Sequence, residues 1–150
     1  MKILLAVDHS KYSEGAIREI AARPWPAKST VRVLSVVEPL PPPAAELWYD
    51  GRGSLDLAHK ELRQRAEEFM KRVAARLKKT KLKVETAVRD GHPRTAIVDE
   101  ARKWRADLIV LGSHGRTGIK RLLLGSVAAS VVGDAPCSVE VVRLKRGKKR

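Results

Sequence analysis

The sequence predicts a single α/β domain built on a mostly parallel, doubly wound sheet. Short apolar runs rich in β-branched residues recur along the chain, as expected of strands buried on both faces. Segments with apolar residues at helical spacing separate every pair of these runs. The 150 residues and 43% apolar content suffice for one core without disulfides or metal ions. We therefore expect right-handed crossovers with helices on the faces of one sheet.

The first strand is expected over Lys2–Val7, where the continuous run KILLAV ends at Asp8. Ser10 or Ser13 can cap the helix that follows, because both hydroxyls precede the first apolar residues at helical spacing. That helix turns three apolar residues inward and ends before two prolines: Ala16, Ile17, Ile20, Pro24 and Pro26.

The second strand is expected over Val31–Val37, which is rich in valine. A proline-rich stretch then opens a loop that runs from Pro39 to about Gly53. The longest helix starts at Ser54 and repeats apolar residues at steps of three or four, which places them on one stripe. These residues are Leu55, Ala58, Leu62, Ala66, Phe69, Val73 and Leu77.

The second half of the chain alternates in the same way. Three more strands are expected, over Lys83–Val88, Asp107–Leu111 and Ser138–Val142. The helix between the first two follows the turn Gly91–Pro93 and has Ala96, Ile97 and Ala101 facing inward. A glycine-rich loop and an apolar helix over Ser126–Val132 connect the last two, and Asp134–Pro136 break the chain before the final strand.

The charge of the chain predicts a folded unit followed by a tail. Lys and Arg number 31 against 17 Asp and Glu, which gives a net charge of +14. Residues 143–150 read RLKRGKKR, so we expect a folded domain over residues 1–142 and a basic flexible tail over 143–150. A second basic block runs from Lys60 to Lys83. This charge indicates either attraction to a polyanion such as nucleic acid or a solvated helix face, and base-reading aromatic residues are scarce.

The cytoplasm is the expected compartment. No apolar stretch approaches the roughly 20 residues that a membrane helix needs, so we expect no membrane insertion. The apolar run at the amino end stops at Asp8, which is too early for a typical signal peptide. Cys137 is the single cysteine and cannot form an intrachain disulfide.

The segment most informative about function starts where the fourth strand ends. Residues 112–126 read GSHGRTGIKRLLLGS, which is a G-x2-G-x9-G-S pattern. Gly112 and Gly115 allow positive φ and a close approach of backbone to a ligand. Gly125 and Ser126 open a helix, whose free N–H groups favour a phosphate, and the Ser126 hydroxyl either caps that helix or donates to a phosphate oxygen. The spacing alone indicates a phosphate site or a glycine-rich turn with an ordinary cap, because neither commoner phosphate loop is present.

With these segments the chain resembles the universal stress protein family, in the ATP-binding branch that carries G-x2-G-x9-G-S/T. The matching segments are the opening KILLAVDHSKYSEGAI, the strand ending SVVEP, the turn GHPRTAIVDEA, and ADLIVLGSHGRTGIKRLLLGSVAASVV followed by APCSVEVV. The resemblance implies a parallel five-stranded sheet in the order 3-2-1-4-5. Strands 1 and 4 then flank a topological switch point, where ligands bind outside the carboxyl ends of the strands.

The resemblance also implies an adenine nucleotide site, with ATP as the ligand and Mg²⁺ held by its phosphates. Asp8 would accept a hydrogen bond from a ribose hydroxyl, or would instead stabilise a turn or cap a helix. Val36 would offer backbone groups to the adenine edge. The other implied residues surround the nucleoside or hold the phosphates: Ala6, Val7, Leu111 and Gly112 for the nucleoside, and Gly115, Gly125, Ser126 and Val127 for the phosphates, with His114 and Arg116 adding charge or hydrogen bonds.

Three classes of function stay open from the sequence. The first is a stress-response regulatory protein that binds ATP and acts through conformation or partners. The second is a slow ATPase or related nucleotide-processing enzyme, and the third is a module that binds nucleic acid or another polyanion. Asp8, His9 and His114 are the plausible acid–base groups near the crevice. No carboxylate pair for two metals and no lysine in a phosphate loop is evident, so we assign no catalytic residue and expect slow hydrolysis at most.

A homodimer is implied by the resemblance, with the last strand as the contact. Glu140 lies within that strand. An inward charge on an edge strand opposes pairing, or else it meets an arginine across a two-fold axis.

Overall fold

The computed structural model describes residues 1–40, 54–116 and 124–144. One sheet runs through this part of the chain in the order β3-β2-β1-β4-β5, and every neighbouring pair is parallel. The predicted fold class and strand order are therefore confirmed. The strands are β1 (Lys2–Ala6), β2 (Thr30–Val37), β3 (Lys83–Asp90), β4 (Leu108–Gly112) and β5 (Ser138–Val142). The helices are α1 (Lys11–Ala22), α3 (Ser54–Leu77), α4 (Pro93–Trp104) and α5 (Ser126–Asp134).

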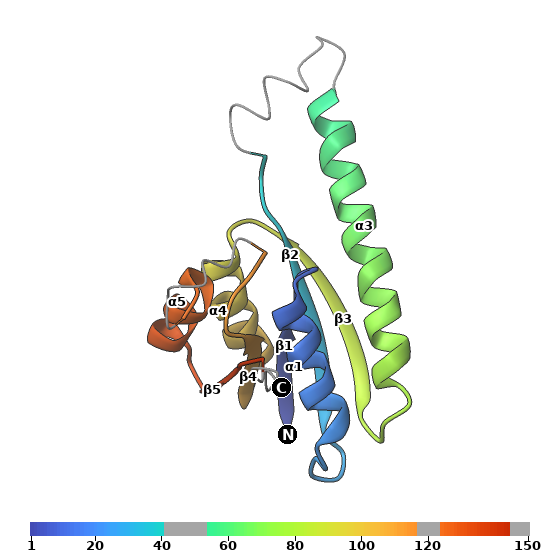
Figure 1. The fold of residues 1–150 in the computed structure, drawn as a ribbon, viewed down its shortest axis with the longest axis vertical. Helices are drawn as coiled ribbons and strands as arrows, with labels where there is room; N and C mark the ends of the chain where they lie inside the picture. Colours follow the sequence, from blue (N-terminus) through green and yellow to red (C-terminus); the bar gives the residue numbers. More distant parts are fainter. Residues whose placement is uncertain (41–53, 117–123, 145–150) are drawn as a thin grey trace, which may run out of the picture.

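The helices cover both faces of the sheet (Figure 1). Successive side chains of β1 point to opposite faces, as the period of two in a strand requires. Ile3 and Leu5 pack with residues of α1 and α3, whereas Leu4 and Ala6 pack with residues of α4 and α5. Two cores thus enclose one buried strand, which explains why its sequence is apolar throughout.

The predicted loop between β2 and α3 and the predicted glycine-rich loop before α5 lie largely outside the described residues, in 41–53 and 117–123. Most of the predicted tail, residues 145–150, also lies outside them. Leu144 is described, and its Cδ2 atom is 3.1 Å from where a Cβ at Gly15 of α1 would stand. Of the helices that the structure describes, none is long and apolar enough to cross a bilayer.

A buried carboxylate lies between α4 and the sheet. Glu100 is 3% exposed and accepts hydrogen bonds from Arg32 at 2.8 Å and from Arg89 at 2.8 and 3.2 Å. Arg32 also binds Glu85 at 2.7 Å, and its guanidinium lies 4.4 Å from the centre of the Trp104 ring. The sequence prediction placed Ala96, Ile97 and Ala101 on the inward face of α4 and missed the charged network.

Strand β5 forms one edge of the sheet, and its central charge is paired within the chain. The two terminal nitrogens of the Arg23 guanidinium, Nη1 and Nη2, each donate to the Glu140 carboxylate at 2.7 Å. Glu19, one turn before Arg23 on α1, binds the same guanidinium at 2.7 Å. These hydrogen bonds raise the pKa of Arg23. Of the two predicted alternatives for Glu140, an arginine partner is present, but it comes from the same chain.

Candidate functional site

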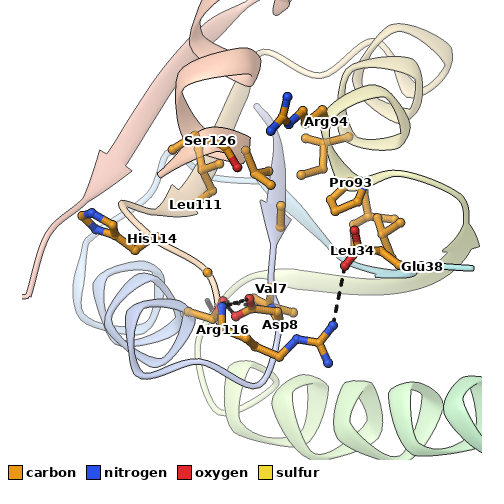
Figure 2. A pocket seen from close by; sticks show the side chains of 18 of the residues that line it. Val7, Asp8, Leu34, Glu38, Pro93, Arg94, Leu111, His114, Arg116 and Ser126 are labelled. Atoms are coloured by element: carbon orange, nitrogen blue, oxygen red, sulfur yellow. Dashed lines mark hydrogen bonds and ion pairs between the residues drawn. The ribbon is translucent and has the colours of Figure 1, made fainter. Parts of the chain in front are cut away.

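A pocket of about 770 Å³ opens beyond the carboxyl ends of β1, β2 and β4 (Figure 2). Its size is within the range of sites that hold small organic ligands. Strands β1 and β4 are neighbours, and the chain leaves them toward opposite faces of the sheet, so the pocket lies at the topological switch point. It is lined by all of the predicted site residues except Gly125: Ala6, Val7, Asp8, Val36, Leu111, Gly112, His114, Gly115, Arg116, Ser126 and Val127.

Asp8 joins three segments at the base of the pocket. Its Oδ1 atom accepts from the Ser10 N–H at 2.9 Å and from the Ser13 hydroxyl at 2.8 Å. Its Oδ2 atom accepts from the Arg116 N–H at 3.1 Å. Ser10 in turn caps α1 by accepting from the Ser13 N–H. The predicted turn-stabilising role of Asp8 is therefore present, while its contact with a ribose stays a prediction.

The glycines of the motif are required by close approach and not by positive φ. Among the described glycines, positive φ occurs at Gly91, so Gly112 and Gly115 do not adopt the positive φ that glycine allows, and their approach to a ligand stays a prediction. A Cβ at Gly112 would lie 2.7 Å from the carbonyl carbon of Tyr12, which shows that α1 packs directly on the end of β4. A Cβ at Gly115 would lie 3.1 Å from Asp8 Oδ2, inside the pocket lining.

Helix α5 starts at the pocket wall. Its N-cap residue is Gly125, with no side-chain cap bond, and Ser126 is the first helical residue. The predicted capping alternative for Ser126 was therefore wrong, because Gly125 occupies the N-cap position and no side chain caps the helix. Gly125 lies outside the pocket lining, and its N–H donates to the carbonyl of Ser113 at 2.7 Å. The exposed Ser126 side chain and the free N–H groups of the first turn are left at the pocket.

Charged side chains surround the mouth of the pocket. The Arg116 guanidinium lies 3.7 Å from the Glu38 carboxylate at the end of β2, marked by a dashed line in Figure 2. Arg94 and His92 line the pocket from the start of α4. The sequence prediction missed Glu38, His92 and Arg94. A signal was available, because the turn GHPR follows a parallel strand whose carboxyl end must lie at this edge of the sheet.

The two predicted histidines have different surroundings. His114 lines the pocket, with its Nδ1 atom 3.1 Å from the Ser113 hydroxyl oxygen. His9 is outside the lining, and its ring centre lies 4.3 Å from that of Phe69 on α3. Burial and the charge of Arg116 lower the pKa of His9. His9 thus lies near the crevice, as expected, but its ring packs on α3 and does not line the pocket.

Comparison with known proteins identifies one family. The model of the universal stress protein family matches residues 1–143. The universal stress protein in the QAH/OAS sulfhydrylase 3′ region of Thermus aquaticus is 32% identical over 142 residues, which are 94% of this chain and 97% of the relative. Universal stress protein MJ0531 of Methanocaldococcus jannaschii is 41% identical over 91 residues. That match covers 61% of this chain, and the chain spans about half of this relative's length, 54%.

Solved structures share the fold. Protein MJ0577, also of Methanocaldococcus jannaschii, has a TM-score of 0.84 at 28% identity over 97% of both chains. The universal stress protein of Archaeoglobus fulgidus in complex with dAMP has a TM-score of 0.63 at 24% identity, covering 95% of this chain and 97% of that one. An Arabidopsis thaliana family protein with AMP bound has a TM-score of 0.59 at 17% identity, covering 100% and 95%. At these identities the last two establish a common fold alone.

Proposed function

Because this chain belongs to the universal stress protein family, we propose that it is a stress-response regulatory protein that binds an adenine nucleotide, with ATP as the physiological ligand. One observation carries the proposal: motif residues from separate parts of the sequence line a single pocket at the switch point of the sheet. Related structures that contain dAMP and AMP support the ligand class.

The pocket offers complementary groups for the two ends of a nucleotide. Ala6, Val7 and Val36 supply an apolar wall for the nucleoside end. The backbone around Gly115 and the free N–H groups at the start of α5 suit the phosphates. The absence of a side chain at Gly115 leaves the space beside Asp8 Oδ2 open. The residues present therefore fit a nucleotide, and Mg²⁺, when bound, would neutralise phosphate charge with few protein ligands.

We expect slow turnover at most, since the pocket carboxylates are already engaged. A general base must be free to accept a proton from an attacking water within hydrogen-bond reach. Asp8 accepts three hydrogen bonds from the protein, and Glu38 is paired with Arg116. Within the described part of the chain, no group of three or more His, Cys, Asp or Glu could hold a metal ion.

Calorimetry with ATP on nucleotide-free protein tests the proposal. Gly115→Glu should abolish binding, because its carboxylate would enter the phosphate space and repel the ligand. Gly133→Glu is the matched control, because a Cβ at that exposed position of α5 meets nothing within 4 Å. Ser126→Ala should weaken binding about tenfold, the loss of one hydrogen bond to a charged group.

Two results would contradict different parts of the proposal. If the unsubstituted protein gives no heat and no thermal shift at millimolar ATP, the proposed function is wrong. If Gly115→Glu and Gly133→Glu both bind as the unsubstituted protein does, the site is misassigned although the chain binds nucleotide.

We also propose a cytoplasmic homodimer that pairs along β5. The Arg23 side chain neutralises Glu140 inside the chain, so the charge on this edge strand opposes pairing less than an unpaired carboxylate would. Sedimentation velocity over a range of protein concentrations should give a dimer, and Glu140→Lys, which repels Arg23, should weaken it. A monomer at every concentration would overturn this part of the proposal.

A second candidate function is contact with a polyanion, favoured by the net charge of +14. The exposed lysines Lys60 and Lys71 of α3, together with the basic tail, would make this contact. Filter binding to duplex DNA over a salt series should give a steep linear fall of log affinity with log salt concentration. A flat dependence would exclude a phosphate-directed contact.

A further inference from the structure

Arg94 enters the pocket from an element that the glycine motif does not include. The crossover from β3 to β4 brings the start of α4 to the carboxyl edge of the sheet, where Pro93, Arg94 and Ile97 line the pocket (Figure 2). Pro93 is the first residue of α4, and its ring fixes φ at a helical value. The direction in which the first turn presents Arg94 is therefore set by the backbone.

Arg94 has no acidic partner among the residues that the structure describes. Arg116 on the opposite wall lies 3.7 Å from Glu38, and the other pocket carboxylate, Asp8, accepts hydrogen bonds from backbone and hydroxyl donors. A guanidinium stays charged at every physiological pH and carries five donors that match phosphate oxygens. Arg94 thus brings a positive charge to the pocket that no carboxylate of residues 1–40, 54–116 or 124–144 neutralises.

Arg94 lies on the side of the pocket where the phosphates are proposed to bind. Helices α4 and α5 share one core cluster, and Ile97 of α4 and Ala128 of α5 belong to it and both line the pocket. In Figure 2, Arg94 and Ser126 lie on one side of the pocket, and Asp8 and Arg116 lie on the other. Phosphates bound at the start of α5 would therefore lie between two arginines.

We infer that Arg94 is a specificity-determining residue that makes the site favour nucleotides with more phosphate charge. The inference rests on the proposed function and adds to it a ranking of ligands, ATP above ADP above AMP. Attraction between a guanidinium and a phosphate chain grows with the charge of the chain, whereas contacts with the base and ribose are the same for all three ligands. Removing the Arg94 side chain should therefore weaken the binding of ATP most and the binding of AMP least.

Calorimetry with ATP, ADP and AMP on nucleotide-free protein tests this ranking. Arg94→Gln should lower the affinity for ATP about tenfold and the affinity for AMP less than about threefold. Arg65→Gln is the matched control, because it removes the same charge from an exposed position of α3 on the opposite face of the sheet. It should leave all three affinities unchanged, and Arg94→Lys should keep part of the preference for ATP. The salt dependence of ATP binding should also become shallower in Arg94→Gln.

The outcomes separate this inference from the proposed function. Equal weakening of ATP and AMP by Arg94→Gln would mean that Arg94 contacts the nucleoside, and would overturn the inference. Affinities identical to those of Arg65→Gln would mean that Arg94 is solvated, and would also overturn it. If the unsubstituted protein binds none of the three ligands, the proposed function itself fails and the inference falls with it.

Discussion

Replacing the buried carboxylate of α4 by an amide should destabilise the protein far more than an exposed replacement of the same kind. Glu100→Gln keeps the size of the side chain but removes its negative charge. In the folded protein this carboxylate is 3% exposed and is shared by Arg32 and Arg89. The variant leaves two guanidinium groups facing a neutral amide inside the fold.

The size of the effect follows from the partners that remain. Breaking a fully buried ion pair costs about 3–5 kcal/mol. Here Arg32 keeps Glu85 at 2.7 Å and its contact with Trp104, and Arg89 is 48% exposed, so water can solvate it. We therefore expect a loss of about 2–3 kcal/mol in the free energy of unfolding. For a chain of this length that corresponds to a fall in Tm of roughly 5–10 °C.

Urea and thermal unfolding at neutral pH measure this loss. Glu67→Gln is the matched control, because Glu67 is 49% exposed and makes one pair with Arg63 on the same helix, at 3.3 Å. Such a pair contributes less than about 0.5 kcal/mol. If Glu100→Gln unfolds within 0.5 kcal/mol of this control, roughly the error of the comparison, the network does not stabilise the fold as argued.

Three further predictions concern the site and the tail. Gly112→Ala should cost about 1–3 kcal/mol of stability, because its Cβ would meet the Tyr12 backbone at 2.7–2.9 Å; unchanged urea unfolding would refute the close packing. His9 should titrate below the ordinary histidine pKa in NMR spectra, and Arg116→Gln should raise that pKa, whereas an unchanged pKa would refute the coupling. Because its folded pKa is lowered, the stability that His9 contributes is fully present above the unfolded pKa of about 6.5 and is lost as the pH falls from there through the lower folded pKa. Deleting Lys145–Arg150 should leave Tm unchanged, and a clear fall would show that the tail packs on the body.

The fold was predictable because the apolar patterns of its core strands and helices can be read within short segments of the sequence. Strand β1 is buried on both faces and reads as one apolar run, and α3 carries a regular apolar stripe. The end of β3 was predicted at Val88, but the strand continues to Asp90. Its last two residues are charged, and they remain in the strand because their backbone pairs with Val36 and Val37 of β2. A side-chain pattern cannot reveal pairing of this kind.

The parts of the site that were missed depend on contacts between distant segments. Arg94 and Glu38 reach the pocket because two crossovers begin at the same edge of the sheet. Glu100 resembles a surface residue of an amphipathic helix, and the arginines that hold it come from two strands far away in the sequence. Likewise, position 112 requires glycine because a Cβ there would clash with the backbone of Tyr12, which lies about a hundred positions earlier in the sequence. Such reasons become visible only when the chain is folded.

The buried Ser113 closes the base of the segment that connects β4 to α5. Its N–H donates to Val142 of β5 at 2.9 Å, and its carbonyl accepts from the Gly125 N–H at 2.7 Å. Ser113 therefore ties the end of β4 to the edge strand through its N–H and to the N-cap of α5 through its carbonyl. One buried residue thus anchors both places from which the glycine motif reaches the pocket. Gly115 and Arg116 lie within three residues after it, and Ser126 follows the Gly125 that it holds.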